Sequence, residues 1–335
     1  MRQPAPQSTR RGAATALAAL AAACALGTAP GAGAQPAWPG AGPITLVNPY
    51  AAGGPADTLA RTLARQLEAR LGQTVIVDNR AGGAAAIGTG YAARARPDGY
   101  TLLIGTSAGH VVTPLMQRIP YDGVADFAFV GVVANQPNVL VANPSLGVRS
   151  VAELRALAQR RPDGLNYASA GAGGATHLGG VVFQQRSGIR MTHVPYPGAA
   201  PALKDVVGGQ VELGMLNLGA VLPFVKDGKL VALAYASEQR SPLLPGVPTM
   251  AEAGVPQAES STWYTLAAPR GTPPAVVERL HAALAATLAD PEFSRFLLAQ
   301  GAERMALDPA ATTAFVQEDR RRMERLLASM GSLAK

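Results

Sequence analysis

The chain has 335 residues, of which 15% are charged and 48% hydrophobic, with a formal net charge of +7 and one cysteine, Cys24. This length is enough to bury the cores of two domains. A single cysteine excludes a fold held together by disulfides. The basic residues are scattered, with few aromatic residues beside them, so the composition gives no support for a nucleic-acid-binding protein.

The first 34 residues have the pattern of a secretory signal peptide. Three arginines precede an apolar stretch, Ala13 to Leu26, that is too short to span a membrane, and small residues follow at 32–34. This pattern predicts cleavage after residue 34 and export to the periplasm. A twin-arginine signal at residues 10–11 and a lipid on Cys24 are the alternatives. Cleavage after residue 34 removes the three arginines and lowers the net charge from +7 to +4. It also removes the only cysteine, which excludes a thiol nucleophile.

Short apolar runs alternate with amphipathic stretches along the rest of the chain. We predict strands at residues 44–47, 75–77, 101–104, 129–133, 139–142, 165–168, 191–194, 211–215, 230–235 and 263–267. We predict helices at residues 57–71, 150–160, 176–187, 199–207, 274–288, 291–300 and 309–329. Repeated alternation of this kind predicts an α/β fold with mixed, mostly parallel sheets and helices on both faces.

The pattern suggests that the chain crosses between two domains twice. A strand-like run between residues 137 and 144 ends before a new strand–helix series, and an extended run at residues 260–269 leads into a helix-rich tail. We therefore predict a discontinuous domain 1 at residues 35–138 and 262–335. Domain 2 would be inserted into it at residues 139–261.

Five glycine-rich turns follow apolar runs and precede helical segments. They lie at residues 51–58, 79–84, 105–109, 169–174 and 196–200. A glycine turn between a strand and a helix leaves main-chain N–H groups free at the helix N-terminus, where they favour an anion. In open α/β sheets the ligand lies beyond the carboxyl ends of the strands, where these turns occur. The pattern predicts a protein that surrounds a small anion with its main chain.

One motif points to an enzyme instead. Residues 105–109, Gly-Thr-Ser-Ala-Gly, match the G-x-S-x-G nucleophile elbow, which would make Ser107 the nucleophile of an exported esterase of the α/β-hydrolase type. Of the four histidines, only His281 lies near the C-terminus, and it falls within a predicted helix rather than a loop. The histidines are also poorly grouped for a metal, and no complete nucleotide motif is present, so we expect neither metal nor cofactor.

Asp57 has two interpretations. A carboxylate in the first turn of a helix interacts favourably with the helix dipole, and this role requires no ligand. The same carboxylate could instead pair with a ligand ammonium. Tyr50 and Tyr196 lie where predicted strands end and loops begin, which favours contact with a ligand.

The order of motifs resembles one family of receptors. The chain is similar to the Bug-type periplasmic substrate-binding proteins of tripartite tricarboxylate transporters at residues 47–61, 77–80, 96–103, 176–178, 193–196, 200–203, 208–211, 244–249 and 268–273. The resemblance implies a two-domain, type II Venus-flytrap receptor that closes on a small carboxylate. It also implies that the protein has no catalytic residues, acts as a monomer and contacts membrane transporter subunits transiently. The loop at residues 79–86 lacks a side-chain amide that is common in the family and has fewer glycines, and Pro197 replaces a common arginine, which suggests a less charged, more apolar or aromatic monocarboxylate.

The glycine turns and the resemblance together predict the ligand site. It would comprise Tyr50, Ala52, Gly53, Gly54, Asp57, Thr58, Arg80, Gly82, Thr106, Ser107, Ser169, Gly173, Thr176, His177, Tyr196 and Gly198.

Overall fold

The computed structural model describes residues 1, 3, 38–161 and 164–330. The chain separates into two units, Met1–Ala41 and Gly42–Lys335, and all that follows concerns the second. The predicted signal peptide, including its cleavage site and Cys24, lies outside the described residues.

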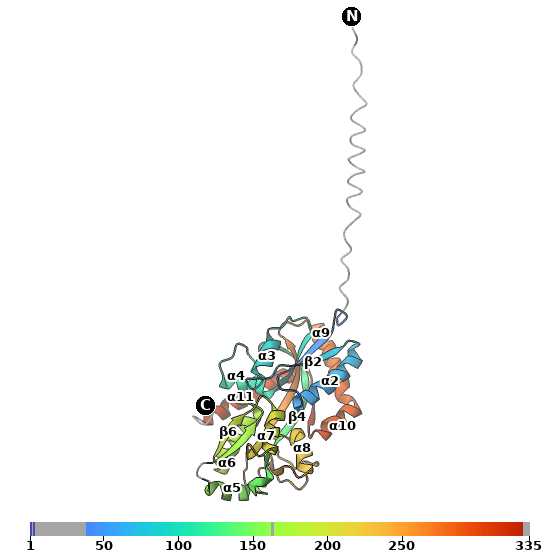
Figure 1. Ribbon diagram of the computed structural model, residues 1–335. Coiled ribbons are helices and arrows are strands. Elements are labelled where there is room, and N and C mark those ends of the chain that lie inside the picture. The colour runs from blue at the N-terminus through green and yellow to red at the C-terminus, as the bar shows by residue number, and fades with distance from the viewer. Residues whose placement is uncertain (2, 4–37, 162–163, 331–335) are drawn as a thin grey trace. The chain divides into compact units, whose positions relative to one another are not determined.

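Three parallel strands begin the second unit (Figure 1). They are β1 (Ile44–Asn48), β2 (Val75–Asn79) and β3 (Thr101–Thr106), with β1 in the middle. Next to β3 lies β9 (Ser261–Pro269), which runs antiparallel to it and also pairs with β4 (Phe127–Ala142). Strand β10 (Glu303–Leu307) pairs with the first half of β4.

Strand β4 is shared by two groups of strands. Its residues up to Pro137 pair with β9, whereas residues from Asn138 onward pair with β7 (Leu213–Asn217) and β8 (Val231–Tyr235). In the sheet, β7 lies beside β5 (Leu165–Ser169), and β5 lies beside β6 (Met191–Pro195). These three strands are parallel to one another. Thus the pairing changes near the boundary expected from the sequence, although a division into two moving domains stays a prediction.

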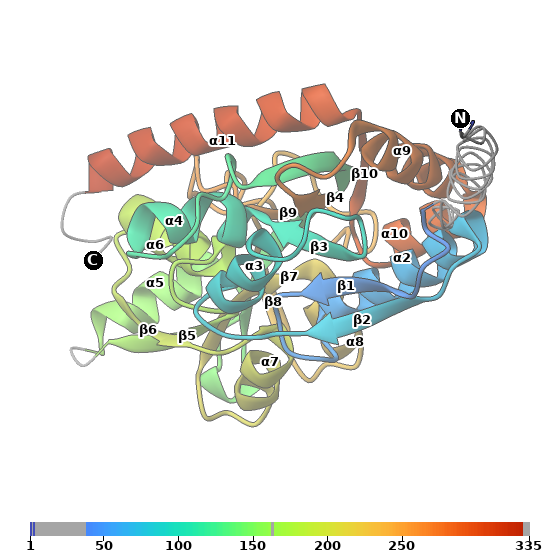
Figure 2. The ribbon, with the colours of Figure 1, turned by 90° about the horizontal axis from the view of Figure 1, so that it is seen from above.

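Helices cover both groups of strands, as expected for an α/β fold. They are α2 (Pro55–Leu71), α3 (Ala86–Ala93), α4 (Thr113–Met116), α5 (Val151–Gln159), α6 (Ala175–Ser187), α7 (Ala199–Val207), α8 (Leu218–Lys226), α9 (Pro274–Ala289), α10 (Pro291–Ala299) and α11 (Pro309–Met330). A π-turn (Ala108–Val112) follows β3, and a 3₁₀ turn (Pro144–Leu146) follows β4. Figure 2 shows α11 running along one side of this unit, and it contacts both β4 and the π-turn.

The predicted periodicities account for most elements. In α2, Leu59, Leu63, Leu67 and Leu71 are buried at helical spacing, and burial of such a stripe against the sheet stabilises the helix. Two predictions need correction, because the separate strands expected at 129–133 and 139–142 form the single strand β4. The predicted ranges do not include α3, α4, α8 or β10.

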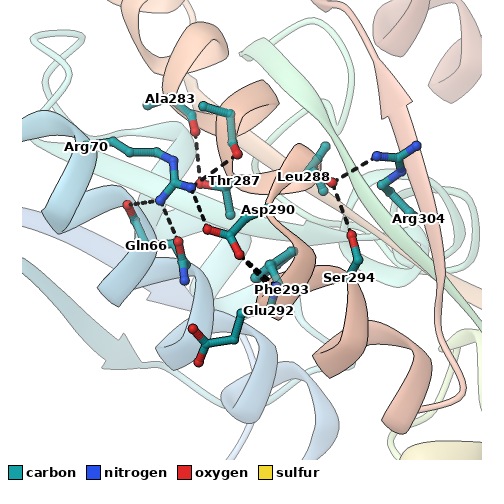
Figure 3. A network of polar contacts seen from close by, with 11 residues as sticks. Gln66, Arg70, Ala283, Thr287, Leu288, Asp290, Glu292, Phe293, Ser294 and Arg304 are labelled. Carbon is teal, nitrogen blue, oxygen red and sulfur yellow. Dashed lines mark hydrogen bonds and ion pairs between the residues drawn. The ribbon is translucent and has the colours of Figure 1, made fainter.

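A polar network fixes the C-terminal end of α2 against α9 and α10 (Figure 3). Arg70 donates to Asp290 over 3.1 Å and also to the carbonyl oxygen of Gln66. The Asp290 carboxylate accepts the N–H of Glu292 and thereby caps α10. These bonds join the C-terminal end of α2 to the segment between α9 and α10.

His110 lies in the core of the first group of strands, 1% exposed. Its Nδ1 lies 2.6 Å from the carbonyl oxygen of Gly123, and its Nε2 lies 3.1 Å from Thr265 Oγ1. Since a carbonyl only accepts, Nδ1 carries the proton and Nε2 accepts from the threonine hydroxyl. Burial lowers the pKa of His110 to about 4.

We expect acidification from pH 7 to pH 5 to lower the free energy of unfolding by about 2 kcal/mol through His110. The unfolded chain binds a proton below its ordinary pKa of 6.5, whereas the folded chain does so only near pH 4. The stabilisation is therefore present above pH 6.5 and lost between these two values. Urea unfolding at pH 7 and pH 5 measures it together with the losses of the same sign from His177 and His193, whose pKa values burial also lowers. Equal or greater stability at pH 5 would contradict the neutral, buried state.

Candidate functional site

A small cavity lies where the two groups of strands meet. It holds about 20 Å³ of free space and is lined by Tyr50, Gly54, Pro55, Ala56, Ala170, Gly174, Ala175, Thr176, Ala199, Asn217, Thr262 and Tyr264. These residues come from the loops after β1, β5, β6 and β7 and from β9. The cavity is therefore at the carboxyl ends of parallel strands from both groups, the position that the sequence predicts for a ligand.

Four helices begin at this cavity, and none of them has a side-chain N-cap. The residues at their N-caps are Gly54 for α2, Gly174 for α6, Gly198 for α7 and Asn217 for α8. Of the helices that do not line the cavity, α5 is capped by Ser150 and α10 by Asp290, whereas α3 and α9 also lack a side-chain cap. Uncapped first-turn N–H groups and the positive ends of helix dipoles favour a negatively charged ligand.

The side chains around the cavity are neutral. Its lining contains no Lys, Arg, His, Asp or Glu, and its polar side chains are those of two tyrosines, two threonines and one asparagine. Burial raises the pKa of Tyr50 to about 12 and also raises that of Tyr264, so both hydroxyls keep their protons, and the proton of Tyr264 is donated to Gln136. The Tyr50 hydroxyl lies 3.2 Å from Thr106 Oγ1. An anion here would be met by hydrogen-bond donors rather than by a countercharge.

Main-chain contacts join the loops across the cavity. The N–H of Ala51 donates to the carbonyl oxygen of Pro197 over 3.4 Å. On another side, Gln117 Nε2 donates to the carbonyl oxygen of Ala172 over 3.3 Å. A Cβ on Gly198 would lie 3.4 Å from Ala51, so the two loops approach closely.

Three of the sixteen predicted site residues line the cavity: Tyr50, Gly54 and Thr176. Gly53 and Thr58 instead line a neighbouring cleft of about 470 Å³ between α2, α7 and α8. The hydroxyl of Thr106 lies within hydrogen-bond distance of the Tyr50 hydroxyl, and Gly198 is the N-cap of α7.

Asp57 faces its own loop. Its carboxylate accepts the N–H of Gly53 over 3.0 Å, pairs with Arg61 and accepts from Asn79 Nδ2 over 2.9 Å. Burial raises the pKa of Asp57, but these partners outweigh burial and hold it below its usual value. These contacts fix the loop before α2, which corresponds to the structural interpretation; contact with a ligand ammonium stays a prediction.

Three further predicted residues lie in or beside the loop between β5 and α6: Ser169 ends β5, Gly173 is in the loop and His177 is in the first turn of α6. Gly173 donates its N–H to His177, and Ser169 bonds His193 on β6, as described below. Tyr196 donates to Asp205 over 2.7 Å, and burial together with this carboxylate raises its pKa to about 12.

The four remaining predicted residues also line neither the cavity nor the neighbouring cleft. Arg80 pairs with Asp78 over 2.7 Å and stacks 3.6 Å above the ring of Tyr91. Ala52 is exposed, and Gly82 lies against Ile87. Ser107 lines a separate groove of about 200 Å³ beside α6 and α11.

The geometry around Ser107 does not support the esterase alternative. Within the described residues, its Oγ is buried and has no hydrogen-bond partner. His110 bonds Gly123 and Thr265, and His281 bonds the carbonyl oxygen of Val130, so neither activates the serine. A nucleophile without a base in contact is not an activated serine.

The predicted site omits part of the far wall of the cavity. Asn217, the last residue of β7, and Thr262, the second residue of β9, line it together with Ala199 from the predicted glycine turn at residues 196–200. Tyr264 also lines it and donates to Gln136 over 3.2 Å.

Two searches of the described residues gave negative results. No group of three or more His, Cys, Asp and Glu side chains there could hold a metal ion. Over the same residues, no helix is long and apolar enough to cross a membrane.

Comparisons with known proteins agree with this geometry. Residues 59–332 match the family described as "Tripartite tricarboxylate transporter family receptor". Protein BugT of Bordetella pertussis is 37% identical over 295 residues, which are 88% of this chain and 90% of that protein.

Solved structures give the same result. Rpa4515 of R. palustris with adipate has a TM-score of 0.84 and 38% identity, over 89% of this chain and 98% of that one. The periplasmic binding protein BugD has a TM-score of 0.82 and 35% identity, over 86% of this chain and 97% of that one. MatC of Rhodopseudomonas palustris with bound malate has a TM-score of 0.81 and 29% identity, over 88% of this chain and 100% of that one. The chain therefore belongs to the tripartite tricarboxylate transporter receptor family, whose members are α/β periplasmic solute-binding receptors and not enzymes.

Proposed function

We propose that this chain is an extracytoplasmic receptor that binds one small carboxylate in the cavity between its two groups of strands. The observation that carries the proposal is the convergence of four uncapped helix N-termini on a cavity with no charged side chain. A carboxylate has two oxygens that accept several N–H bonds at once, and charge-assisted hydrogen bonds of this kind are stronger than neutral ones. The adipate and malate bound by two relatives support this ligand class.

The remaining features of the proposal follow from the family and the sequence. The first 34 residues direct export to the periplasm, and the receptor acts there as a monomer. Two domains, joined near Asn138 and Thr262, close on the ligand. The receptor then delivers the carboxylate to the membrane subunits of a tripartite tricarboxylate-type transporter. Because the cavity lining has no cation, the part of the ligand beyond the bound carboxylate group carries less charge than the corresponding part of citrate.

The test is a thermal-unfolding screen of residues 35–335 against short carboxylates, including malate, adipate and benzoate. The matched controls are the corresponding amides, which have the same shape without the charge. We expect one carboxylate at one hundred times its Kd to raise the Tm by about 5 °C or more, because it stabilises the folded state by about 2.7 kcal/mol. A folded protein whose Tm no carboxylate raises above its amide would refute the proposal.

A further inference from the structure

The loop between β5 and α6 forms one wall of the cavity and is held in an unusual conformation. Its residues 170 and 174 line the cavity. Gly171 and Gly173 have φ angles of 145° and 76°, which non-glycine residues rarely adopt. A loop with such angles has no regular ladder of main-chain hydrogen bonds, so other groups must hold it.

Two histidines from different elements supply two of those bonds, beside the bonds from the N–H of Ala170 to Thr176 Oγ1 and from Gln117 Nε2 to the carbonyl oxygen of Ala172. His177, in the first turn of α6, accepts the N–H of Gly173 at its Nδ1 over 2.9 Å. His193, on β6, has its Nε2 2.6 Å from Ser169 Oγ. The same hydroxyl donates to the carbonyl oxygen of Gly171 over 3.2 Å. Both ends of the loop are therefore tied to an imidazole ring.

The two rings also hold each other. They stack with their centroids 3.9 Å apart and their planes 16° apart. Two stacked imidazolium ions would repel each other, and an Nδ1 that accepts an N–H must carry no proton. Burial accordingly lowers the pKa of His177 to about 4, and burial with the neighbouring ring lowers that of His193 to about 3. Both are neutral at pH 7.

The hydrogen-bond direction fixes the tautomer of His177, whose unprotonated Nδ1 leaves the ring proton on Nε2. Ser169 Oγ has one proton and contacts both the carbonyl oxygen of Gly171 and His193 Nε2, so the bond to His193 forms with either tautomer of that ring. Neither histidine is among the residues that line the cavity.

We propose that His177 and His193 are positioning residues, which hold the β5–α6 loop so that the first-turn N–H groups of α6 face the carboxylate. This inference rests on the proposed function. It assigns His177 a role through the loop, in place of the direct ligand contact expected from the sequence.

Amide side chains make a test that separates hydrogen bonding from packing. The oxygen of asparagine can replace a histidine Nδ1, and the terminal amide of glutamine can replace Nε2 in either tautomer, because each lies at the matching distance from Cα. His177→Asn and His193→Gln should therefore keep the loop bonds. His177→Gln and His193→Asn place the same chemical group at the wrong distance and should lose them.

Two measurements read this pattern. In hydrogen exchange followed by mass spectrometry, peptides covering residues 170–176 should exchange about three to ten times faster in His177→Gln and His193→Asn than in the matched variants. The affinity for the carboxylate selected by the screen should fall by the same factor in the same two variants. Urea unfolding of all four checks that they remain folded.

The outcomes are distinct. Equal exchange in all four folded variants would overturn the positioning role, whether or not a carboxylate binds. Faster exchange without a loss of affinity would show that the loop is held by the histidines but does not serve binding, which also overturns the inference. Failure of every carboxylate to bind the unaltered protein would refute the proposed function alone, because the exchange measurement needs no ligand.

Discussion

Replacement of Gly54 by valine is expected to lower the affinity for the carboxylate at least a hundredfold, about 2.7 kcal/mol, while the protein stays folded. Gly54 is the N-cap of α2 and lines the cavity. A Cβ there would lie 3.8 Å from the main-chain nitrogen of Ala200 and 3.9 Å from Ala199 Cβ. The added γ-carbons of valine would fill the space for the ligand and hold α7 away from α2.

The backbone at Gly54 makes this substitution selective. Its φ of −88° and ψ of 174° suit any residue, so valine adds little strain. Gly173, which also lies in a predicted binding loop, is a poorer choice because its φ of 76° would strain any side chain. Gly246→Val, in open space, is the matched control. Isothermal titration should find binding lost only in Gly54→Val; retained affinity would contradict the proposed position of the ligand.

Replacement of Gly123 by alanine is expected to lower the free energy of unfolding by about 3 kcal/mol. A Cβ at this position would lie 2.0 Å from the carbonyl oxygen of His110 and 2.7 Å from its Cα. These are main-chain atoms, so no side-chain rotation relieves the overlap. The same shift would disturb the bond between His110 Nδ1 and the carbonyl of Gly123.

Urea unfolding of Gly123→Ala measures this effect against Gly246→Ala, whose Cβ meets nothing within 4 Å. We expect the control to lie within about 0.5 kcal/mol of the unaltered protein, as surface changes usually do. If Gly123→Ala lowers the free energy of unfolding by less than 1 kcal/mol, the segment around residue 123 can shift at little cost and does not hold His110 in place.

Elements with a clear period could be predicted from the sequence. Helix α7 begins and ends at the predicted residues 199 and 207, and α2 differs only at its first turn. The reason is that one face of each helix is buried, so leucine, valine and alanine recur at helical spacing. The fold class followed from the alternation of such helices with short apolar strands.

The missed elements lack a period for physical reasons. Helix α3, with the sequence AIGTGYAA, is built largely of small residues and has no distinct apolar face. Helix α8 contains Pro223, which normally argues against a helix interior. Strand β10 is mostly exposed, so burial does not select alternating residues. Each is held by contacts with elements distant in the sequence, which periodicity does not record.

The candidate site, like the fold, could be predicted from the sequence only in part. Main-chain donors could be anticipated in part, because the glycine turns at residues 51–58, 169–174 and 196–200 lead into helices at the cavity, whereas the turns at 79–84 and 105–109 do not line it. Side-chain partners could not, because Asn217 and Thr262 approach the cavity only after β7 and β9 pair with β4. Asp57 illustrates the limit, since its position fits two roles and only its contacts with Gly53, Arg61 and Asn79 indicate which one its geometry serves.

A crystal structure with the selected carboxylate bound would test the central claim most directly. We predict that the carboxylate oxygens lie within hydrogen-bond distance of first-turn N–H groups of α2 and α6, with the tyrosine hydroxyls at positions 50 and 264 nearby. No Lys, Arg or His side chain should contact them. A carboxylate paired with a basic side chain, or bound in the groove beside Ser107, would contradict the claim that uncapped helix N-termini form the anion site.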